Sequence, residues 1–259
     1  MSTLPPRQRV REAFQRAAAT YDAAAVVQRL VCERLLARLD PASFGSAAPR
    51  ILDAGCGTGY GASVLRARWP AAHITAADFA PAMLAHARRH ADACCAADIE
   101  ALPLPAACVD LWWSSLTLQW CDARRVFAEA ARVLRSDGRL AVSTLGPGTF
   151  AEMRAAFARV DRYRHTLAFS EADAIVAALT GAGFRDVALQ RENIVLHYPD
   201  LSSLLRAVKA IGANAVGDGA RSGMMGRAAW QTLQDAYEAQ RTPAGLPATY
   251  DVLLLTAGK

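Results

Sequence analysis

The sequence lacks any long uninterrupted apolar run. None of its 259 residues belongs to a segment that approaches the roughly 18 uncharged apolar residues of a membrane helix. The first residues, with Arg7, Arg9 and Arg11 among small side chains, also lack the apolar core of a secretory signal. We therefore expect a cytoplasmic protein with no membrane partner.

Patterns for metal and nucleic-acid binding are also scarce. The six cysteines show no Cys-x-x-Cys pair and have few histidines nearby, so we expect reduced thiols and no metal site. The net charge of +5 and the pI near 9.1 permit an acidic partner. Because the arginines are spread along the chain, without a dense basic tract or interleaved aromatic residues, we expect no nucleic-acid partner.

The most informative segment is an apolar strand that breaks into a glycine-rich turn, residues 51–59, Ile-Leu-Asp-Ala-Gly-Cys-Gly-Thr-Gly. Gly55 and Gly57 would let the backbone approach a ligand closely, and the next helix would offer free N–H groups at its start. A dinucleotide fingerprint needs its third glycine at the position of Tyr60. Nicotinamide and flavin cofactors are therefore disfavoured.

Two further acids follow apolar segments. A strand from Ile74 ends at Asp78, where a carboxylate could accept hydrogen bonds from both hydroxyls of a ribose. Asp98 follows a second short apolar stretch and could accept from an adenine amino group. Asp78 could instead cap a helix, and Asp98 could lie in a solvated turn. The order of three acids at strand ends, beginning with Asp53, favours the cofactor site.

This three-part pattern resembles the class I S-adenosylmethionine-dependent methyltransferases over roughly residues 50–145. The resemblance implies that Asp53 and Gly55 flank the methionine part of S-adenosylmethionine and that Asp78 holds the ribose. Phe79 would stack on the adenine, whose edge would meet Asp98 and Ile99. The full set of cofactor-binding residues that the resemblance implies is Tyr21, Asp53, Ala54, Gly55, Gly57, Asp78, Phe79, Met83, Asp98, Ile99 and Ser114.

Strand and helix patterns alternate along the chain. Strands are expected at 51–54, 73–77, 94–97, 109–114, 139–145, 185–197 and 249–257, with Asp137-Gly138 as the turn into the fifth. Helices are expected at 7–40, 60–68, 81–91, 123–134, 171–182, and from a capping box at Thr149 and Glu152 to about Tyr163. The alternation predicts a mostly parallel, Rossmann-like α/β sheet with helices on both faces.

We expect one methyltransferase domain over residues 1–259. Residues 1–40 would form an N-terminal helical lid, and residues 50–198 and 247–259 the sheet core. Residues 199–246 form too long a connection for a simple hairpin, so we expect a helical cap over the active-site edge before the last strand.

The segment Ser114 to Cys121 follows the fourth strand, at the sheet edge where ligands bind in such folds. It contains no Asn-Pro-Pro-Tyr motif and no acid or histidine placed as a general base. That absence fits an acceptor that is already nucleophilic at neutral pH, such as a carboxylate. Alignment of a carboxylate with the methyl group could then supply about 7–11 kcal/mol, and we expect no catalytic side chain.

Nearly the whole chain resembles the malonyl-acyl-carrier-protein O-methyltransferases of biotin synthesis. The resemblance rests on Ala13-Phe14, Ala17-Ala18, Thr20-Tyr21-Asp22, Gln28, Leu118-Gln119-Trp120, Thr144-Leu145, Gly148-Thr149, Glu152, His165, Phe169, 208–213 and Thr249-Tyr250. It implies methylation of the free malonyl carboxylate on acyl carrier protein, which is the partner, and the ester would prime pimeloyl synthesis for biotin.

By the same resemblance, the acceptor would bind to Tyr21, Gln119, Trp120, Arg154 and Lys209. Tyr21 could equally be a packed helix residue, and Trp120 a core residue. Arg154 could be a solvated helix flank. Lys209, with Arg206 nearby, could meet an acidic carrier protein or simply face solvent. We take His165 as a structural histidine.

Two alternatives remain open at this point. Mitochondrial complex I assembly factors with a methyltransferase-like domain, which act as hydroxylases or assembly proteins, share Tyr-Pro near 198–199 and Ala-Thr-Tyr at 248–250. A methyltransferase for a free small acid, such as an aconitate, would need no carrier-protein surface.

Overall fold

The protein is built around one seven-stranded sheet in the order β3, β2, β1, β4, β5, β7, β6. We describe it from a computed structural model in which residues 4–40, 47–212 and 225–259 are described. The strands are β1 (Arg50–Ala54), β2 (His73–Asp78), β3 (Ala93–Ala96), β4 (Val109–Ser115), β5 (Leu134–Leu145), β6 (Arg185–Tyr198) and β7 (Leu246–Gly258). The first five are parallel, and β7 runs antiparallel to both of its neighbours. The predicted mostly parallel sheet is confirmed.

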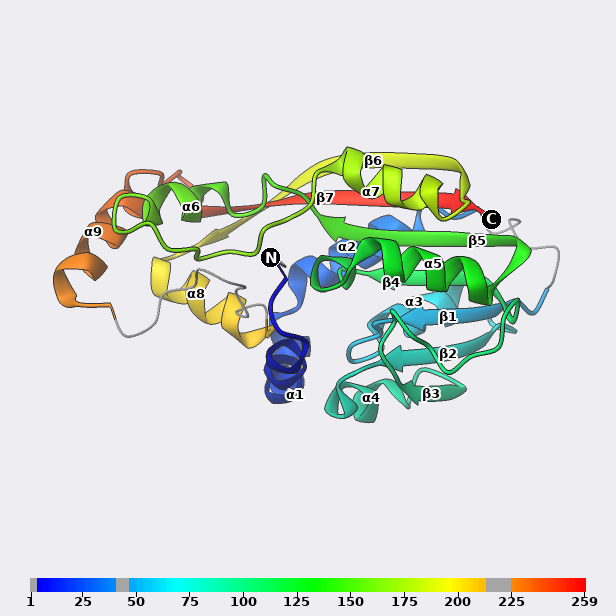
Figure 1. Ribbon diagram of the computed structural model, residues 1–259. Helices are drawn as coiled ribbons and strands as arrows, with labels where there is room; N and C mark the ends of the chain where they lie inside the picture. Colours follow the sequence, from blue (N-terminus) through cyan, green and yellow to red (C-terminus); the bar gives the residue numbers. More distant parts are fainter. Residues whose placement is uncertain (1–3, 41–46, 213–224) are drawn as a thin grey trace.

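Helices cover both faces of this sheet (Figure 1). They are α1 (Arg7–Ala24), α2 (Val26–Leu36), α3 (Tyr60–Arg68), α4 (Pro81–Ala87), α5 (Ala123–Val133), α6 (Ala151–Phe157), α7 (Ala172–Gly181), α8 (Leu201–Ala210) and α9 (Arg227–Glu238), with a 3-10 turn η1 (Leu118–Trp120). Side chains of α2 and α3 pack into one hydrophobic core, and those of α5 and α7 pack into another.

The two cores follow from period-two alternation along buried strands. Trp112 and Trp113 are adjacent in β4 and both fully buried, but they belong to opposite cores. A strand that is buried on both faces reads as a continuous apolar run, which is typical of parallel sheets covered by helices.

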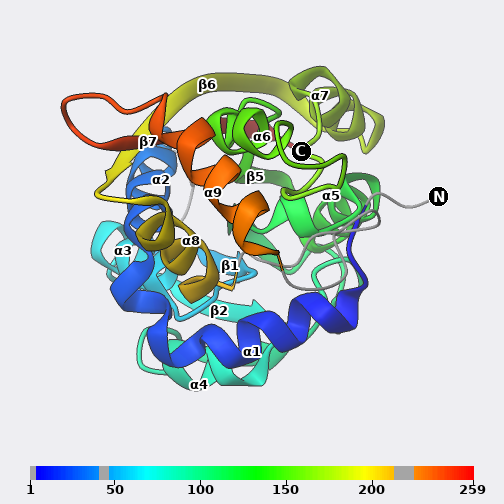
Figure 2. The ribbon, with the colours of Figure 1, turned by 90° about the vertical axis from the view of Figure 1, so that its left-hand side faces the viewer.

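The chain order reverses between β1 and β4, which are neighbours in the sheet. Ligands bind at such a switch point, beyond the carboxyl ends of the strands. Helix α1 crosses this end of the molecule below β2 and in front of α4 (Figure 2). The sheet topology therefore leaves the glycine turn after β1 in a space that α1 closes.

The predicted helix 7–40 is two helices. Ala25, with φ −81° and ψ 43°, interrupts it. The break has a packing reason, because α2 joins the core on one sheet face while α1 lies over the strand ends. Part of the predicted loop 41–49 lies outside the described residues.

The predicted capping box at Thr149 and Glu152 was wrong. Phe150, in the left-handed region at φ 57°, precedes α6, which ends at Phe157 and not near Tyr163. The buried Thr149 hydroxyl accepts from the backbone N–H of Asp251 at 3.1 Å. Glu152 accepts from the N–H of Thr249. Partners from β7 thus replace the local cap.

The predicted turn at Asp137-Gly138 was also wrong, because β5 begins at Leu134 and runs through these residues, with a register shift against β4.

The region 199–246 contains α8 and α9, and its residues 213–224 lie outside the described part. Within the described residues, we find no helix with the length and apolar character to cross a membrane.

Candidate active site

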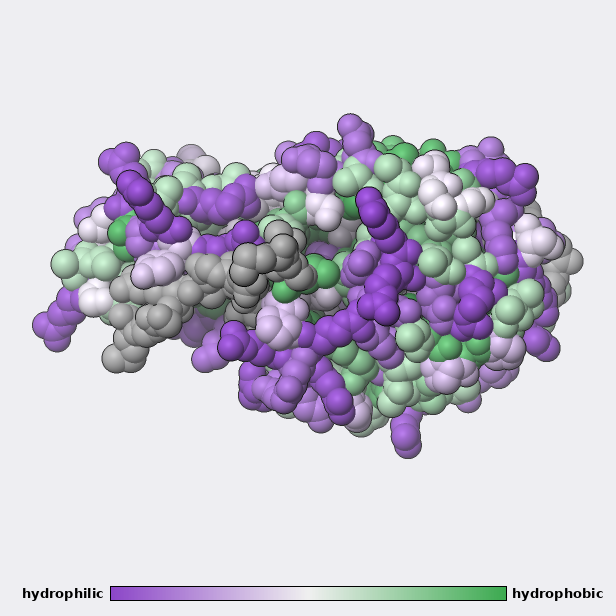
Figure 3. Space-filling model, viewed as in Figure 1, coloured by the Kyte–Doolittle hydropathy of each residue, from purple (hydrophilic) through white to green (hydrophobic). Residues whose placement is uncertain are grey.

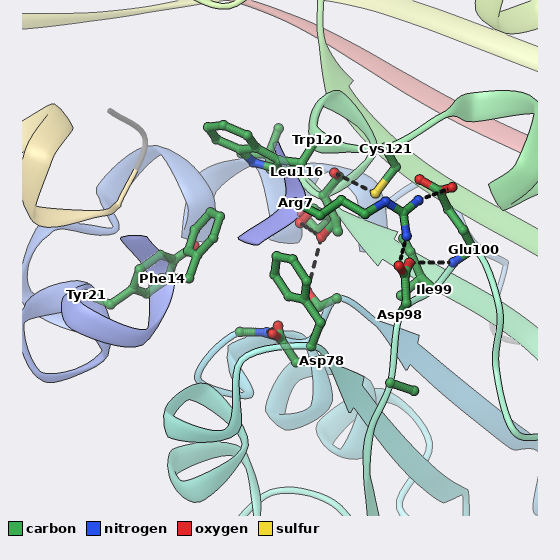
Figure 4. Close-up of a pocket in the computed structure, with 16 residues that line it drawn as sticks. Arg7, Phe14, Tyr21, Asp78, Asp98, Ile99, Glu100, Leu116, Trp120 and Cys121 are labelled. Atoms are coloured by element: carbon green, nitrogen blue, oxygen red, sulfur yellow. Dashed lines mark hydrogen bonds and ion pairs between the residues drawn. The ribbon is translucent and has the colours of Figure 1, made fainter. Parts of the chain in front are cut away.

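A cavity of about 650 Å³ lies at the carboxyl ends of β1, β2 and β4, against α1 (Figure 4). We call it the adenosine cavity. It is lined by Arg7, Phe14, Tyr21, Gly55, Gly57, Asp78, Phe79, Ala97, Asp98, Ile99, Glu100, Ser115, Leu116, Thr117, Trp120 and Cys121. The three elements of the sequence motif therefore meet in one space.

Asp78 connects β2 with the glycine turn. One carboxylate oxygen accepts from the N–H of Gly57 at 3.0 Å, and the other accepts from the N–H of Ala80 at 2.8 Å, at the start of α4. Burial raises the pKa of Asp78 to about 6. Each carboxylate oxygen can accept a further hydrogen bond and Asp78 lines the cavity, so the group can brace the turn and still accept from a ribose diol.

Gly55 is in the left-handed region, at φ +76°. Its N–H donates to the carbonyl of Ala77 at 2.7 Å, and its own carbonyl accepts from the Thr117 hydroxyl at 3.1 Å. A Cβ atom at this position would overlap the Thr117 side chain. Only glycine fits there, which explains the turn sequence.

A second space of about 470 Å³ continues from the first, and we call it the methionine cavity. Asp53 lines it and is 2% exposed, and its Oδ2 has no hydrogen-bond partner among the described residues. Burial raises the pKa of Asp53 to about 7. An unpartnered buried carboxylate is costly, so this atom suits a ligand ammonium group.

Arg29 lines the same cavity from α2, with its guanidinium 5.5 Å from the ring centroid of Tyr60. It supplies the only positive side chain among the described residues of that lining. A guanidinium suits the carboxylate of an amino acid, and Asp53 suits its amino group. The two cavities together therefore have the donor set and shape for S-adenosylmethionine.

Tyr21 lies where these spaces meet, because it lines both of them and a third cavity described below. Phe14 lies two turns before Tyr21 on the same face of α1, and its ring centroid is 6.5 Å from that of Tyr21 and 5.5 Å from that of Trp120. Burial, followed by the charge of Asp78, raises the pKa of Tyr21 well above its usual value. Tyr21 is therefore a neutral phenol that can donate a hydrogen bond.

Comparison with known proteins agrees with this geometry. Residues 52–142 match the family model described as "Methyltransferase domain". The chain is 48% identical to the malonyl-[acyl-carrier protein] O-methyltransferase of Dechloromonas aromatica, covering 99% of this chain and 96% of that one. It is 46% identical to the protein of the same name from Laribacter hongkongensis, covering 95% and 87%.

A solved S-adenosylmethionine-dependent methyltransferase from Thermotoga maritima shares the fold, with a TM-score of 0.59 and 16% identity over 96% of this chain and 99% of that one. The chain belongs to the malonyl-[acyl-carrier protein] O-methyltransferase family. It is an S-adenosylmethionine-dependent methyltransferase. These relatives do not favour a complex I assembly factor or an enzyme for free small acids.

The third space of this methyltransferase, about 690 Å³, meets the other two at Tyr21, and we call it the acceptor cavity. It is lined by Phe14, Tyr21, Gln28, Leu116, Gln119, Trp120, Leu145, Phe150, Met153, His165, Thr166, Leu167, Phe169, Val208, Ile211 and Tyr250. His165 stacks on Phe157 at 3.6 Å, and its Nε2 lies 2.8 Å from Asp161. Those contacts give His165 a structural environment.

The cavities collect most of the predicted cofactor-binding residues but not Ala54, Met83 or Ser114. Ser114 is buried and donates to the carbonyl of Ala54 at 2.7 Å, while its neighbour Ser115 lines two cavities. Met83 is buried in a small core beside Ala80. The alternation of β4 decides which serine faces the ligand.

Arg154 and Lys209 lie outside the cavity linings. The Arg154 guanidinium donates to the backbone carbonyls of Thr149 and Pro147, the latter at 2.6 Å. Lys209 is exposed on α8, whose Val208 lines the acceptor cavity. Contact of either cation with acceptor or carrier remains a prediction.

The lining residues that were not predicted from the sequence include Arg7, Gln28, Arg29 and Thr117. Treating 7–40 as one helix hid the turn at Ala25 that brings Gln28 and Arg29 to the site. Gln28 was noticed only as part of the family pattern. The signal available in the sequence was the pair of adjacent polar side chains, Gln28 and Arg29, just after the break between the two helices.

Proposed function

We propose that this enzyme methylates the free carboxylate of malonyl-acyl-carrier-protein, giving the malonyl methyl ester that primes pimeloyl synthesis for biotin. The observation that carries the proposal is the 48% identity, over 99% of this chain, to a protein with that name. The acceptor cavity supports it independently, because its chemistry suits a carboxylate on an apolar thioester arm.

The cofactor supplies a methyl group that is activated by its positive sulfur. In this proposal Asp53 and Arg29 hold the amino-acid end, and Asp78 holds the ribose. Phe79 and Ile99 give the adenine an apolar setting, and Asp98 accepts at its edge. The neutral phenol of Tyr21 lies at the only point that all three cavities share among the described residues.

The acceptor side needs alignment and no base. A carboxylate has already lost its proton at neutral pH. No Asp, Glu, Lys or Arg occurs among the described residues that line the acceptor cavity. A cation bonded to the attacking oxygen would reduce its nucleophilicity, whereas neutral donors orient it at lower cost to reactivity.

Tyr21, Gln28 and Gln119 are such neutral donors. The Gln28 side chain makes no hydrogen bond with a described residue, and it lines both the methionine and acceptor cavities. Gln119 already donates to the carbonyl of Leu116 at 2.8 Å, which leaves one amide N–H for a ligand. We infer that these groups hold the malonyl carboxylate beside the methyl group. Trp120 packs against the acyl chain.

The carrier protein would approach over α8. Arg206 and Lys209 are exposed there, next to Val208 and Ile211 of the acceptor cavity. Exposed cations of this kind steer an acidic partner. In the proposal Arg154 positions residues 147–149 and, through them, Phe150, which lines the acceptor cavity. We assign the reaction to the cytoplasm, where the free cysteines of the described chain would stay reduced.

The test is a comparison of methyl acceptors. Purified enzyme with labelled S-adenosylmethionine is given malonyl-acyl-carrier-protein, malonyl-CoA, or free malonate, and methyl esters are identified by mass spectrometry. We expect the highest kcat/KM with the carrier-bound substrate and little reaction with free malonate. A kcat/KM for free malonate equal to that for malonyl-acyl-carrier-protein would contradict the carrier-protein assignment. A thioester product that carries the labelled methyl group at a position other than the carboxylate would contradict carboxyl methylation.

A further inference from the structure

The first turn of α1 carries an arginine that spans the adenosine cavity. The Arg7 guanidinium forms ion pairs with Asp98 and Glu100, which follow β3 (Figure 4). Arg7 is 47% exposed, Asp98 32%, and Glu100 only 3%. A side chain from the start of the chain is thus tied to the residues expected beside the adenine.

Arg7 also separates two spaces. On one side is the adenosine cavity, and on the other is an open groove between α1 and α4, which we call the outer groove. Four residues line both: Arg7, Phe79, Ala97 and Asp98. The ion pair between Arg7 and Asp98 therefore stands at the boundary between the cavity and the solvent-open groove.

The remainder of α1 is fixed by hydrogen bonds along its length and by an ion pair between Asp22 and Arg89, 3.5 Å apart. The Gln15 side chain accepts from the N–H of Ala82 at 3.1 Å, and the Thr20 hydroxyl donates to the carbonyl of Ala210 at 3.1 Å. The outward face of this helix is hydrophilic, in the lower centre of Figure 3. The inward face contributes Phe14 and Tyr21 to the acceptor cavity.

One helix therefore closes the cofactor site and forms a wall of the acceptor site. We propose that Arg7 is a positioning residue that seals the adenosine end of the cofactor site through Asp98 and Glu100. Cofactor exchange requires this seal to open, whereas the acceptor cavity is complete only when α1 is in place. Cofactor consequently binds before acceptor, and the demethylated cofactor leaves last.

The strength of the seal comes mainly from Glu100. An exposed pair such as that with Asp98 contributes little, but a buried carboxylate depends strongly on its partners. Glu100 also accepts from the N–H of Asp122 at 2.9 Å, and Arg125 lies 3.6 Å away. The loss of Arg7 is therefore partly compensated, and we expect exchange to accelerate roughly three- to tenfold.

The first experiment measures dissociation of S-adenosylmethionine and S-adenosylhomocysteine by stopped-flow fluorescence, using Trp120 of the cavity as a reporter. Arg7→Gln should accelerate both, and Arg9→Gln, an exposed neighbour without an ion pair to any described residue, should not. Salt should accelerate dissociation from the wild type and have little effect on Arg7→Gln. Arg7→Lys should restore part of the slow dissociation.

The second experiment tests the order by isotope trapping. Enzyme holding labelled S-adenosylmethionine is mixed with acceptor and excess unlabelled cofactor. The wild type should transfer most of its bound label, and Arg7→Gln much less. If a folded Arg7→Gln enzyme keeps the wild-type dissociation rate and the wild-type fraction of trapped label, the ion pairs of Arg7 have no role in retaining the cofactor. The same trapping and dissociation values in Arg9→Gln and Arg7→Gln would also overturn the proposal.

Because dissociation is measured without acceptor, this inference does not depend on malonyl-acyl-carrier-protein as the substrate.

Hydrogen exchange gives a third readout that does not depend on turnover. Cofactor should protect the first two turns of α1 in the wild type, and Arg7→Gln should lose that protection. Full protection in the variant would contradict a seal at Arg7.

Discussion

At the scale of residues, the site depends on two buried carboxylates with different partners. Asp78 accepts two backbone N–H groups, whereas Asp53 keeps an oxygen without a partner among the described residues. Burial raises the pKa of both, to about 6 and about 7. Because both pKa values are raised, Asp53 and Asp78 in the empty site stay partly protonated at pH values where an exposed aspartate would be fully ionised.

We expect cofactor affinity to rise with pH between about 5.5 and 7.5. A ligand ammonium near Asp53 and hydroxyls near Asp78 favour the carboxylate forms, so binding releases protons below the raised pKa values. Calorimetry in buffers of different ionisation enthalpy measures both affinity and proton release. An affinity that stays constant across this range would contradict the role of these carboxylates.

Asp78→Asn should weaken cofactor binding by about 1.5–3 kcal/mol, because hydrogen bonds to a charged group are lost. The amide keeps one oxygen for the backbone, so the fold should survive. Asp137→Asn, at an exposed position of β5, is the matched control. Unchanged affinity in a folded Asp78→Asn enzyme would leave Asp78 with only its role at the start of α4.

The chemical step itself should be nearly independent of pH from about 6 to 8, because a carboxylate acceptor is ionised throughout. The measurement is a single-turnover rate at saturating cofactor and acceptor. His165→Gln should keep that rate, since His165 packs on Phe157 and pairs with Asp161. A steep rise near pH 7 that disappears in His165→Gln would identify a general base.

At the scale of elements, α1 and α8 meet at Gly212. This residue has φ +71°, and a Cβ would lie 3.3 Å from the Ala13 carbonyl and from Phe14. Val208 and Ile211, just before it, line the acceptor cavity together with Phe14. The shape of that cavity therefore depends on how closely the two helices approach.

Gly212→Ala should raise the Michaelis constant for the acceptor several-fold and leave cofactor affinity within about twofold. The left-handed backbone costs a side chain about 1–3 kcal/mol, and the added methyl group pushes α8 from α1. Steady-state kinetics and calorimetry on the same preparation separate the two effects. An unchanged acceptor constant would show that the helices can separate without changing the cavity.

Reversing Lys209 and Arg206 to glutamate should raise the Michaelis constant for malonyl-acyl-carrier-protein in a salt-dependent way and leave turnover of malonyl-CoA nearly intact. Both side chains are exposed on α8. The control reverses Arg124 and Arg139, exposed arginines that line none of the three cavities. Equal losses on both substrates would contradict a carrier-binding surface on α8.

At the scale of the whole molecule, cofactor binding should stabilise the fold. At 100 times Kd the gain is about 2.7 kcal/mol, which corresponds to roughly 5 °C in Tm for a chain of this size. The raised pKa values of Asp53 and Asp78 make the empty fold lose stability as pH rises from about 4 to 7, because the folded state holds more protons there.

The rise in Tm on adding S-adenosylmethionine should therefore be larger at pH 7.5 than at pH 5.5, at equal cofactor concentration. Differential scanning calorimetry with and without cofactor measures the difference. Asp78→Asn should reduce the pH dependence of this rise. A rise that is equal at both pH values would mean that the buried carboxylates do not face the ligand.

The sequence by itself determined the element types and the cofactor edge. Apolar runs ending near Asp53 and Asp78 place polar groups at one edge, because parallel strands share their carboxyl ends. The glycine turn needs left-handed backbone at Gly55, which is a local property. Such features depend on neighbours in the chain and can be predicted from it.

The tertiary structure alone decided which side chains complete the site. Arg7 meets Glu100 and Arg29 enters the methionine cavity because the chain turns at Ala25 and α1 packs across the strand ends. Thr149 pairs with β7, and so the expected cap is absent. These contacts join segments far apart in sequence, and packing selects them over local alternatives that are equally compatible with the residues themselves.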